Sequence, residues 1–201
     1  MYKKCLYSKL IRDALRNKDK IIKILNKYRR VPLSKDWYPL RIYCENCKKD
    51  STNILNYDKE YKITYECKCS YSNEIDFRKN GIVKLVWRAD WPMRWVYEKV
   101  DFEPGGKDHY ASGGARISGE EIIKSVWKTK GPYGFVYEWI ALKGGKEFSS
   151  SKGIVVTLND CLEIYEPEII RYLFAGTRPN AAFNISFDLD VLKIYEDFDK
   201  C

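Results

Sequence analysis

The chain has 201 residues, of which 45% are hydrophobic, and a formal net charge of +8. This length and composition are typical of a globular protein with one domain, or a core with a satellite, and argue against a disordered chain. No apolar run approaches the roughly 20 residues of a membrane-spanning helix, and residues 1–4 do not lead into the apolar segment of a secretory signal, so we expect a cytoplasmic protein with no membrane partner.

The positive charge is concentrated at the amino terminus. Residues 1–30 contain eleven Lys or Arg against two Asp, so the rest of the chain is close to neutral. Apolar residues recur at near-helical spacing over residues 8–28, which predicts an amphipathic helix, continuous or broken, that ends before Pro32. A solvated helix face and contact with a polyanion both explain its basic side.

Residues 36–79 contain short aromatic and β-branched runs between polar turns, which predicts small strands. Four of the seven cysteines lie here as a CxxC pair and a CxC pair separated by nineteen residues: Cys44, Cys47, Cys67 and Cys69. Four thiolates at this spacing predict one tetrahedral Zn²⁺ site, and because the protein fills all four positions the zinc would be structural. The alternative is four unliganded cysteines in a reducing compartment.

Beyond residue 81 the predicted elements alternate. A strand over residues 82–87 is followed by a helix over 120–127, which Ser118 and Glu121 would open as a capping box. A strand over 135–142 precedes two helices that begin at Thr157 and Pro167. This alternation predicts an α/β fold.

Two loops carry candidate chemistry. In the sequence GGKDH, Gly106 lets the backbone come close to a ligand and Asp108 can accept hydrogen bonds from ribose hydroxyls, although a plain turn has the same composition. In the sequence SSSKG, the Lys152 ammonium follows three hydroxyl groups that can surround phosphate oxygens, although a flexible linker also has this composition.

The order of these motifs resembles the distal half of the catalytic domain of class I, archaeal-type lysyl-tRNA synthetases. The resemblance rests on GGKDH, the strand over 135–140, SSSKG and the helix opening EPEIIRY, with WRADWPMRW, VDFEP and RYLFAGTRPN in support. It covers essentially all of the chain. It implies an incomplete Rossmann-like core with an inserted small β module of zinc-ribbon type: residues 1–35 as a basic helical segment of the core, 36–80 as the zinc-binding insertion and 81–201 as the distal half.

The resemblance also implies roles for single residues. SSSKG would be the family's form of the mobile KMSKS loop, with Lys152 as the catalytic cation. The residues implied to bind ATP are Gly106, Asp108, Ser149, Ser150, Ser151 and Lys152. Those implied to shape the lysine pocket are Trp87, His109 and Tyr137, where aromatic rings can hold an ammonium, although core packing is an equal explanation for the Trp and the Tyr.

The implied reaction is attack of the lysine carboxylate on the ATP α-phosphate, assisted by Mg²⁺, and transfer of lysine from the adenylate to tRNA(Lys). Such chemistry mainly requires alignment and charge placed against the developing negative oxygens.

One family motif is absent. A HIGH-type ATP motif needs two nearby histidines, and the chain has one, His109. No region corresponds to the family's anticodon-binding part. We therefore expect a fragment or one half of a split enzyme that acts with a separate amino-terminal half. The alternative is a non-catalytic zinc-containing RNA-binding or interaction protein derived from a synthetase, which would use the basic helix.

Overall fold

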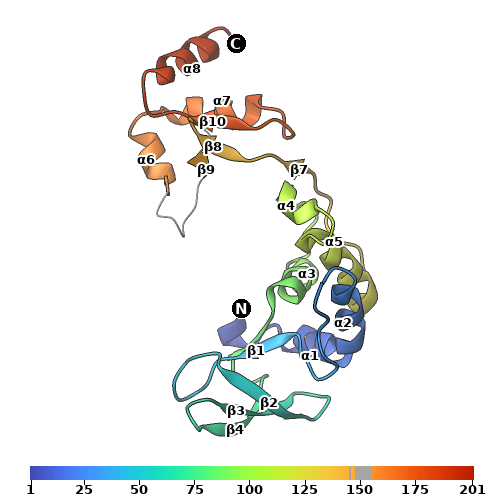
Figure 1. The fold of residues 1–201 in the computed structure, drawn as a ribbon. Helices are drawn as coiled ribbons and strands as arrows, with labels where there is room; N and C mark the ends of the chain where they lie inside the picture. The colour runs from blue at the N-terminus through green and yellow to red at the C-terminus, as the bar shows by residue number, and fades with distance from the viewer. Residues whose placement is uncertain (145, 148–154) are drawn as a thin grey trace. The chain divides into compact units, whose positions relative to one another are not determined.

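The computed structural model describes residues 1–144, 146–147 and 155–201 (Figure 1). The chain divides into two compact units. We call residues 1–103 together with 109–133 the N unit, and residues 104–108 together with 134–201 the C unit.

The amino-terminal helix of the N unit is broken. After a short 3₁₀ turn at Tyr2–Lys4, α1 (Ser8–Arg16) and α2 (Lys18–Asn26) are separated by Asn17. The Asn17 side chain donates to the Asp13 carbonyl at 2.9 Å and so competes with the backbone for the helical acceptor. The predicted amphipathic pattern is confirmed, because both helices bury an apolar face.

The segment between β1 (Leu40–Ile42) and β5 (Val83–Leu85) forms a small sheet of its own, and β1 and β5 pair with each other at its two ends. This antiparallel pairing brings the two ends of the segment together. Inside that segment β2 (Thr52–Tyr57), β3 (Lys62–Cys67) and β4 (Ser72–Asp76) form an antiparallel sheet. Its buried side chains alternate along β3, as the period of a half-buried strand requires. The prediction of small strands in this region is confirmed.

The strand predicted over residues 82–87 is too long. It ends at Leu85, and α3 (Trp87–Glu98) begins after Val86, whose backbone is extended. The helix was not predicted because Pro92 lies inside it, and because a run of tryptophans has no strong helical propensity of its own. Trp87 therefore begins a helix and does not end a strand.

The predicted capping box at Ser118 is wrong. α5 (Ala115–Ile122) begins after Gly114 and continues into a π-helical turn at Ile123–Trp127. A Cβ on Gly114 would collide with the His109 carbonyl, so packing selects glycine at the helix start. Ser118 is fully buried one turn further on, where its hydroxyl bonds to the carbonyls of Gly114 and Ala115 at 3.2 Å each.

The described part of the C unit contains short strands, together with helices between residues 158 and 199. β6 (Gly105–Gly106) is parallel to β7 (Val136–Tyr137), and β8 (Ile140–Leu142) lies between β10 (Phe183–Ile185) and β9 (Lys146–Glu147). The single strand predicted over 135–142 is thus two strands, because the Glu138 N–H leaves the ladder and donates to the Pro179 carbonyl at 2.8 Å. The short helix α4 (Lys107–Tyr110) crosses the division between the units.

Both predicted helix starts in the C unit are confirmed. Thr157 and Asp160 form a reciprocal capping box at the start of α6 (Leu158–Leu162). Pro167 opens α7 (Pro167–Gly176), and α8 (Asp190–Asp199) follows β10.

The described residues therefore form a mixed α/β protein, with strands in four sheets of two or three strands each. Within this described part, none of the helices has the length and apolar character to cross a membrane.

Candidate functional site

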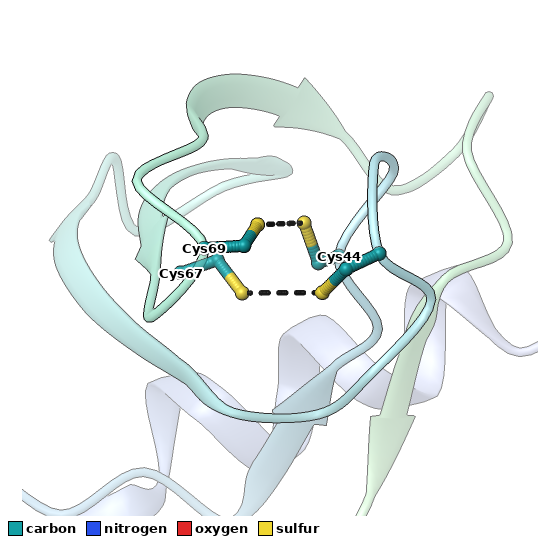
Figure 2. Close-up of side chains that lie close together, drawn as sticks. Cys44, Cys67 and Cys69 are labelled. Carbon is teal, nitrogen blue, oxygen red and sulfur yellow. Dashed lines mark hydrogen bonds between the residues drawn. The ribbon is translucent and has the colours of Figure 1, made fainter.

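The four predicted cysteines come together in the N unit. All four sulfur atoms lie within 4.8 Å of one another. Figure 2 shows the side chains of Cys44, Cys67 and Cys69 close together, with Cys44 facing the other two. The Sγ atoms of Cys44 and Cys69 are 3.7 Å apart, and those of Cys47 and Cys67 are 3.6 Å apart. A tetrahedral zinc with bonds of about 2.3 Å requires sulfur–sulfur separations of about 3.8 Å, close to these two distances, so this cluster could hold zinc.

Each cysteine pair is held by a tight turn. Lys48 follows the first pair with φ 62°, and its N–H donates to the Cys44 carbonyl at 2.9 Å. Ser70 follows the second pair with φ 63°, and its N–H donates to the Cys67 carbonyl at 2.9 Å. A left-handed residue after each pair turns the chain back, so both sulfurs of a pair point to one side.

A carboxylate inside the first pair ties it to the sheet. Glu45 accepts hydrogen bonds from the Tyr65 hydroxyl at 3.1 Å, from the Asn73 amide at 2.8 Å and from the Asn80 amide at 2.7 Å. Tyr65 is fully buried, and its oxygen also accepts the Glu45 N–H at 3.1 Å. Glu45 was not predicted from the sequence, because its partners follow it by 20 to 35 residues.

The Cys69 thiol is prepared to lose its proton. The backbone N–H of Tyr71 lowers the pKa of the Cys69 thiol to about 6, and hydrogen bonds from the neighbouring thiols act in the same direction. A thiol with a lowered pKa supplies the thiolate that zinc binds.

A second candidate site begins on α3, where three tryptophans follow one another at helical spacing. The ring centroids of Trp87 and Trp91 are 5.2 Å apart, and those of Trp91 and Trp95 are 4.9 Å apart. The indole N–H groups of Trp91 and Trp95 both donate to the Glu103 carboxylate, the first at 2.9 Å. Trp91 and Trp95 are buried, whereas Trp87 is 53% exposed.

His109 completes an aromatic wall with these rings. Its ring centroid lies 5.3 Å from that of Trp91 and 6.5 Å from that of Trp87. The structure therefore brings together two residues that were predicted for the lysine pocket, Trp87 and His109. We did not predict that Trp91 and Glu103 lie beside these two residues, although the spacing of the three tryptophans indicates one face of a helix.

The C unit holds three other predicted residues near one another. Gly106 pairs with Tyr137 in the parallel β6–β7 ladder. A Cβ on Gly106 would stand 2.9 Å from an Asp108 carboxylate oxygen and 3.6 Å from the Tyr137 ring, so a larger residue here would displace the Asp108 side chain. Beside them, Lys107 and Glu138 form an ion pair at 2.6 Å, which lowers the pKa of Glu138.

The SSSKG loop lies outside the described residues. Ser149, Ser150, Ser151 and Lys152 keep their predicted phosphate-binding role as a prediction only.

The basic face of α1 and α2 is partly neutralised within the N unit. Arg12 and Arg16 form ion pairs with Glu60, and Lys27 pairs with Glu121. These contacts favour a structural use for part of the amino-terminal charge.

Comparison with known proteins matches the whole chain. A family model described as "tRNA synthetases class I (K)" covers residues 1–201. The lysine–tRNA ligase of Borrelia garinii is 48% identical over 99% of this chain and 38% of its own length. The lysine–tRNA ligase of Treponema pallidum is 46% identical over 99% of this chain and 38% of its own, and that of Pyrococcus horikoshii is 42% identical over 100% and 39%. The chain thus spans less than two fifths of these curated relatives.

Proposed function

The chain belongs to the class I tRNA synthetase (K) family, and from this we propose that its residues form part of a lysine–tRNA ligase. The observation that carries the proposal is the family match over residues 1–201, together with identities of 42% to 48% to lysine–tRNA ligases. Because the matched part is about two fifths of those proteins, the activity is proposed for the complete cytoplasmic enzyme that contains these residues.

The proposed reaction joins lysine to tRNA(Lys) in two steps. The lysine carboxylate attacks the α-phosphate of Mg²⁺-bound ATP, pyrophosphate leaves, and a terminal ribose hydroxyl of the tRNA then displaces AMP from lysyl-adenylate. Lys152 supplies positive charge to the phosphate oxygens, with Ser149, Ser150 and Ser151 as hydroxyl donors. Asp108 accepts hydrogen bonds from the ribose, and Gly106 leaves room for this approach.

We assign Trp87, His109 and Tyr137 to the lysine pocket, because aromatic rings attract an ammonium by cation–π interaction. Trp87 and His109 supply the two rings that lie near each other in the N unit. The high exposure of Trp87 supports this role over simple core packing, because a core residue on the same helix face, such as Trp95, is almost fully buried.

The remaining parts of the proposal concern architecture. The ATP-binding residues belong to an incomplete Rossmann-like core, and residues 36–80 are a zinc-binding insertion. Zinc held by Cys44, Cys47, Cys67 and Cys69 is structural, since all four ligand positions are protein thiolates. The β1–β5 pairing that closes this segment and the sulfur geometry support an insertion that folds around its metal.

The test is lysine-dependent pyrophosphate exchange in a complete enzyme. Residues 1–201 would replace the matched segment of the Borrelia garinii ligase, with and without Lys152→Ala. Loss of the cation should lower the exchange rate by about 10²- to 10³-fold, the effect of removing one group that stabilises a developing oxyanion. Lys193→Ala, an exposed lysine on α8, is the matched control. An unchanged rate in the Lys152 variant would refute the assignment.

The zinc assignment has its own test. Native mass analysis should find one metal ion per chain, and a variant that lacks Cys44 and Cys69 should lose it. Retention of one zinc by that variant would refute the site independently of the catalytic proposal.

A further inference from the structure

A basic groove crosses the N unit where the end of α2 meets β1 and the start of α3. It encloses about 540 Å³. Its charged lining comes from several segments between residues 29 and 88: Arg29, Arg41, Asp50, Lys84 and Arg88. Trp87 also lines the groove.

The groove has an excess of positive charge. Four cationic side chains line it against one carboxylate, and that carboxylate, Asp50, is already paired with Arg41 at 2.5 Å. Arg88 is anchored through one terminal nitrogen, which donates to the Gly113 carbonyl at 2.8 Å and to Ser118 at 3.1 Å. Arg29 and Lys84 are exposed and have no carboxylate partner among the described residues. The groove is therefore prepared for an anionic ligand.

Aromatic side chains lie among these charges. Trp37, Tyr43 and Trp87 line the same groove, and Tyr43 and Trp87 are 38% and 53% exposed. Leu25, Leu33 and Val86 add apolar surface between them. Cations that follow a phosphate backbone, combined with rings on which bases stack, are the features by which proteins bind unpaired nucleotides. A paired duplex keeps its bases inside, and an inorganic polyphosphate has none.

Another basic surface of the N unit has cationic side chains but no aromatic ring in its lining. The hollow at the end of the π-helical turn is lined by Lys124, Lys128, Thr129 and Lys130, without an aromatic side chain. It can attract polyanions in the same way but offers nothing to a base.

We propose that the groove binds a single-stranded end of RNA, with Arg29 and Lys84 on its phosphates and Tyr43 stacked on a base. The identity of this RNA as tRNA rests on the proposed function, because Trp87 belongs both to the groove and to the proposed lysine pocket. A nucleotide end in the groove is then adjacent to the amino acid that it must accept.

Fluorescence anisotropy of the zinc-loaded full chain tests the binding. The probes are a labelled single-stranded hexanucleotide RNA and a blunt duplex of the same length, with inorganic polyphosphate as competitor. Tyr43→Ala should weaken binding of the single strand by about tenfold, and Tyr43→Phe should restore it, since phenylalanine keeps the ring face. The duplex should bind at least about tenfold more weakly than the single strand.

The salt dependence separates the groove from general polyanion attraction. Each phosphate contact to a single strand contributes about −0.7 to the slope of log K against log salt. The double variant Arg29→Ala/Lys84→Ala should therefore reduce the magnitude of this slope by about 1.4. The double variant Lys128→Ala/Lys130→Ala, which removes the same charge, is the matched control and should leave the slope nearly unchanged. The proposal is overturned if the control pair has the same effect as the groove pair, if Tyr43→Ala binds normally, or if the duplex binds as tightly.

A second measurement keeps this inference separate from the proposed function. In the complete chimaeric enzyme, Arg29→Ala/Lys84→Ala should raise KM for tRNA by about tenfold and leave lysine-dependent pyrophosphate exchange unchanged. An unchanged KM would remove tRNA as the ligand of the groove. Absence of exchange in the parent chimaera would instead contradict the proposed ligase, while the hexanucleotide result would stand.

Discussion

Replacing Glu45 with alanine should weaken zinc binding by about 10- to 100-fold, the usual cost of losing a group that orients metal ligands. The Glu45 carboxylate accepts three hydrogen bonds, from Tyr65, Asn73 and Asn80, at 3.1, 2.8 and 2.7 Å. Hydrogen bonds to a charged group contribute about 1.5–3 kcal/mol each, and partial exposure of Glu45 and both amides reduces this to about 1 kcal/mol. The total loss is about 3 kcal/mol in the module that orders the first cysteine pair.

Two assays would measure this loss. Competition with a chromogenic chelator gives the zinc affinity, and urea unfolding of the zinc-loaded chain gives the stability. Glu45→Gln, which keeps the shape and one carbonyl oxygen, should have an intermediate effect. Glu74→Ala is the control, because its ion pair with Lys62 at 3.3 Å is exposed on both sides and should contribute less than about 1 kcal/mol. Zinc affinity and urea midpoint equal to those of the parent in Glu45→Ala would refute the reasoning.

Three further changes have distinct expected outcomes. Gly106→Ala should raise KM for ATP by about tenfold in the complete enzyme, because the new Cβ would press on the neighbouring carboxylate; an unchanged KM would contradict its place at the nucleotide. Trp87→Ala should raise KM for lysine by about tenfold with little loss of stability, whereas Trp95→Ala should cost about 3–5 kcal/mol in thermal unfolding; equal destabilisation by both would assign Trp87 to the core. A serine hydroxyl, a backbone N–H and a lysine ammonium lower the pKa of Asp188. The ionised Asp188 therefore stabilises the fold above the ordinary pKa of about 4, and this stabilisation is lost as the pH falls below that value. Asp188→Asn should make Tm fall less steeply in acid, and a decline of Tm identical to that of the parent would contradict this role.

The sequence predicted those features that depend on local chemistry. Thr157 and Asp160 begin a helix through hydrogen bonds that span three residues, and Pro167 fits a first turn whatever packs against it. The four cysteines were recognised because ligand spacing within each pair is local, and the antiparallel sheet then brings the two pairs together.

The features that the sequence did not predict depend on distant contacts. The start of α5 is set by a collision between residue 114 and the His109 carbonyl, which local capping rules do not contain. The Glu45 contacts and the Trp91 and Trp95 bonds to Glu103 likewise join residues from different elements. The proximity of Trp87 and His109 was expected from family resemblance, since no spacing rule joins two residues twenty-two positions apart.

Charging of tRNA(Lys) with lysine tests the central claim most directly. The enzyme for this measurement is the Borrelia garinii ligase with its matched segment replaced by residues 1–201, purified with zinc and compared with the parent ligase. We expect lysine to be attached to tRNA(Lys) in an ATP-dependent reaction, with no charging by other amino acids. A folded, zinc-containing chimaera that binds tRNA but never forms lysyl-tRNA, while the parent ligase does, would contradict the claim and favour a non-catalytic RNA-binding role.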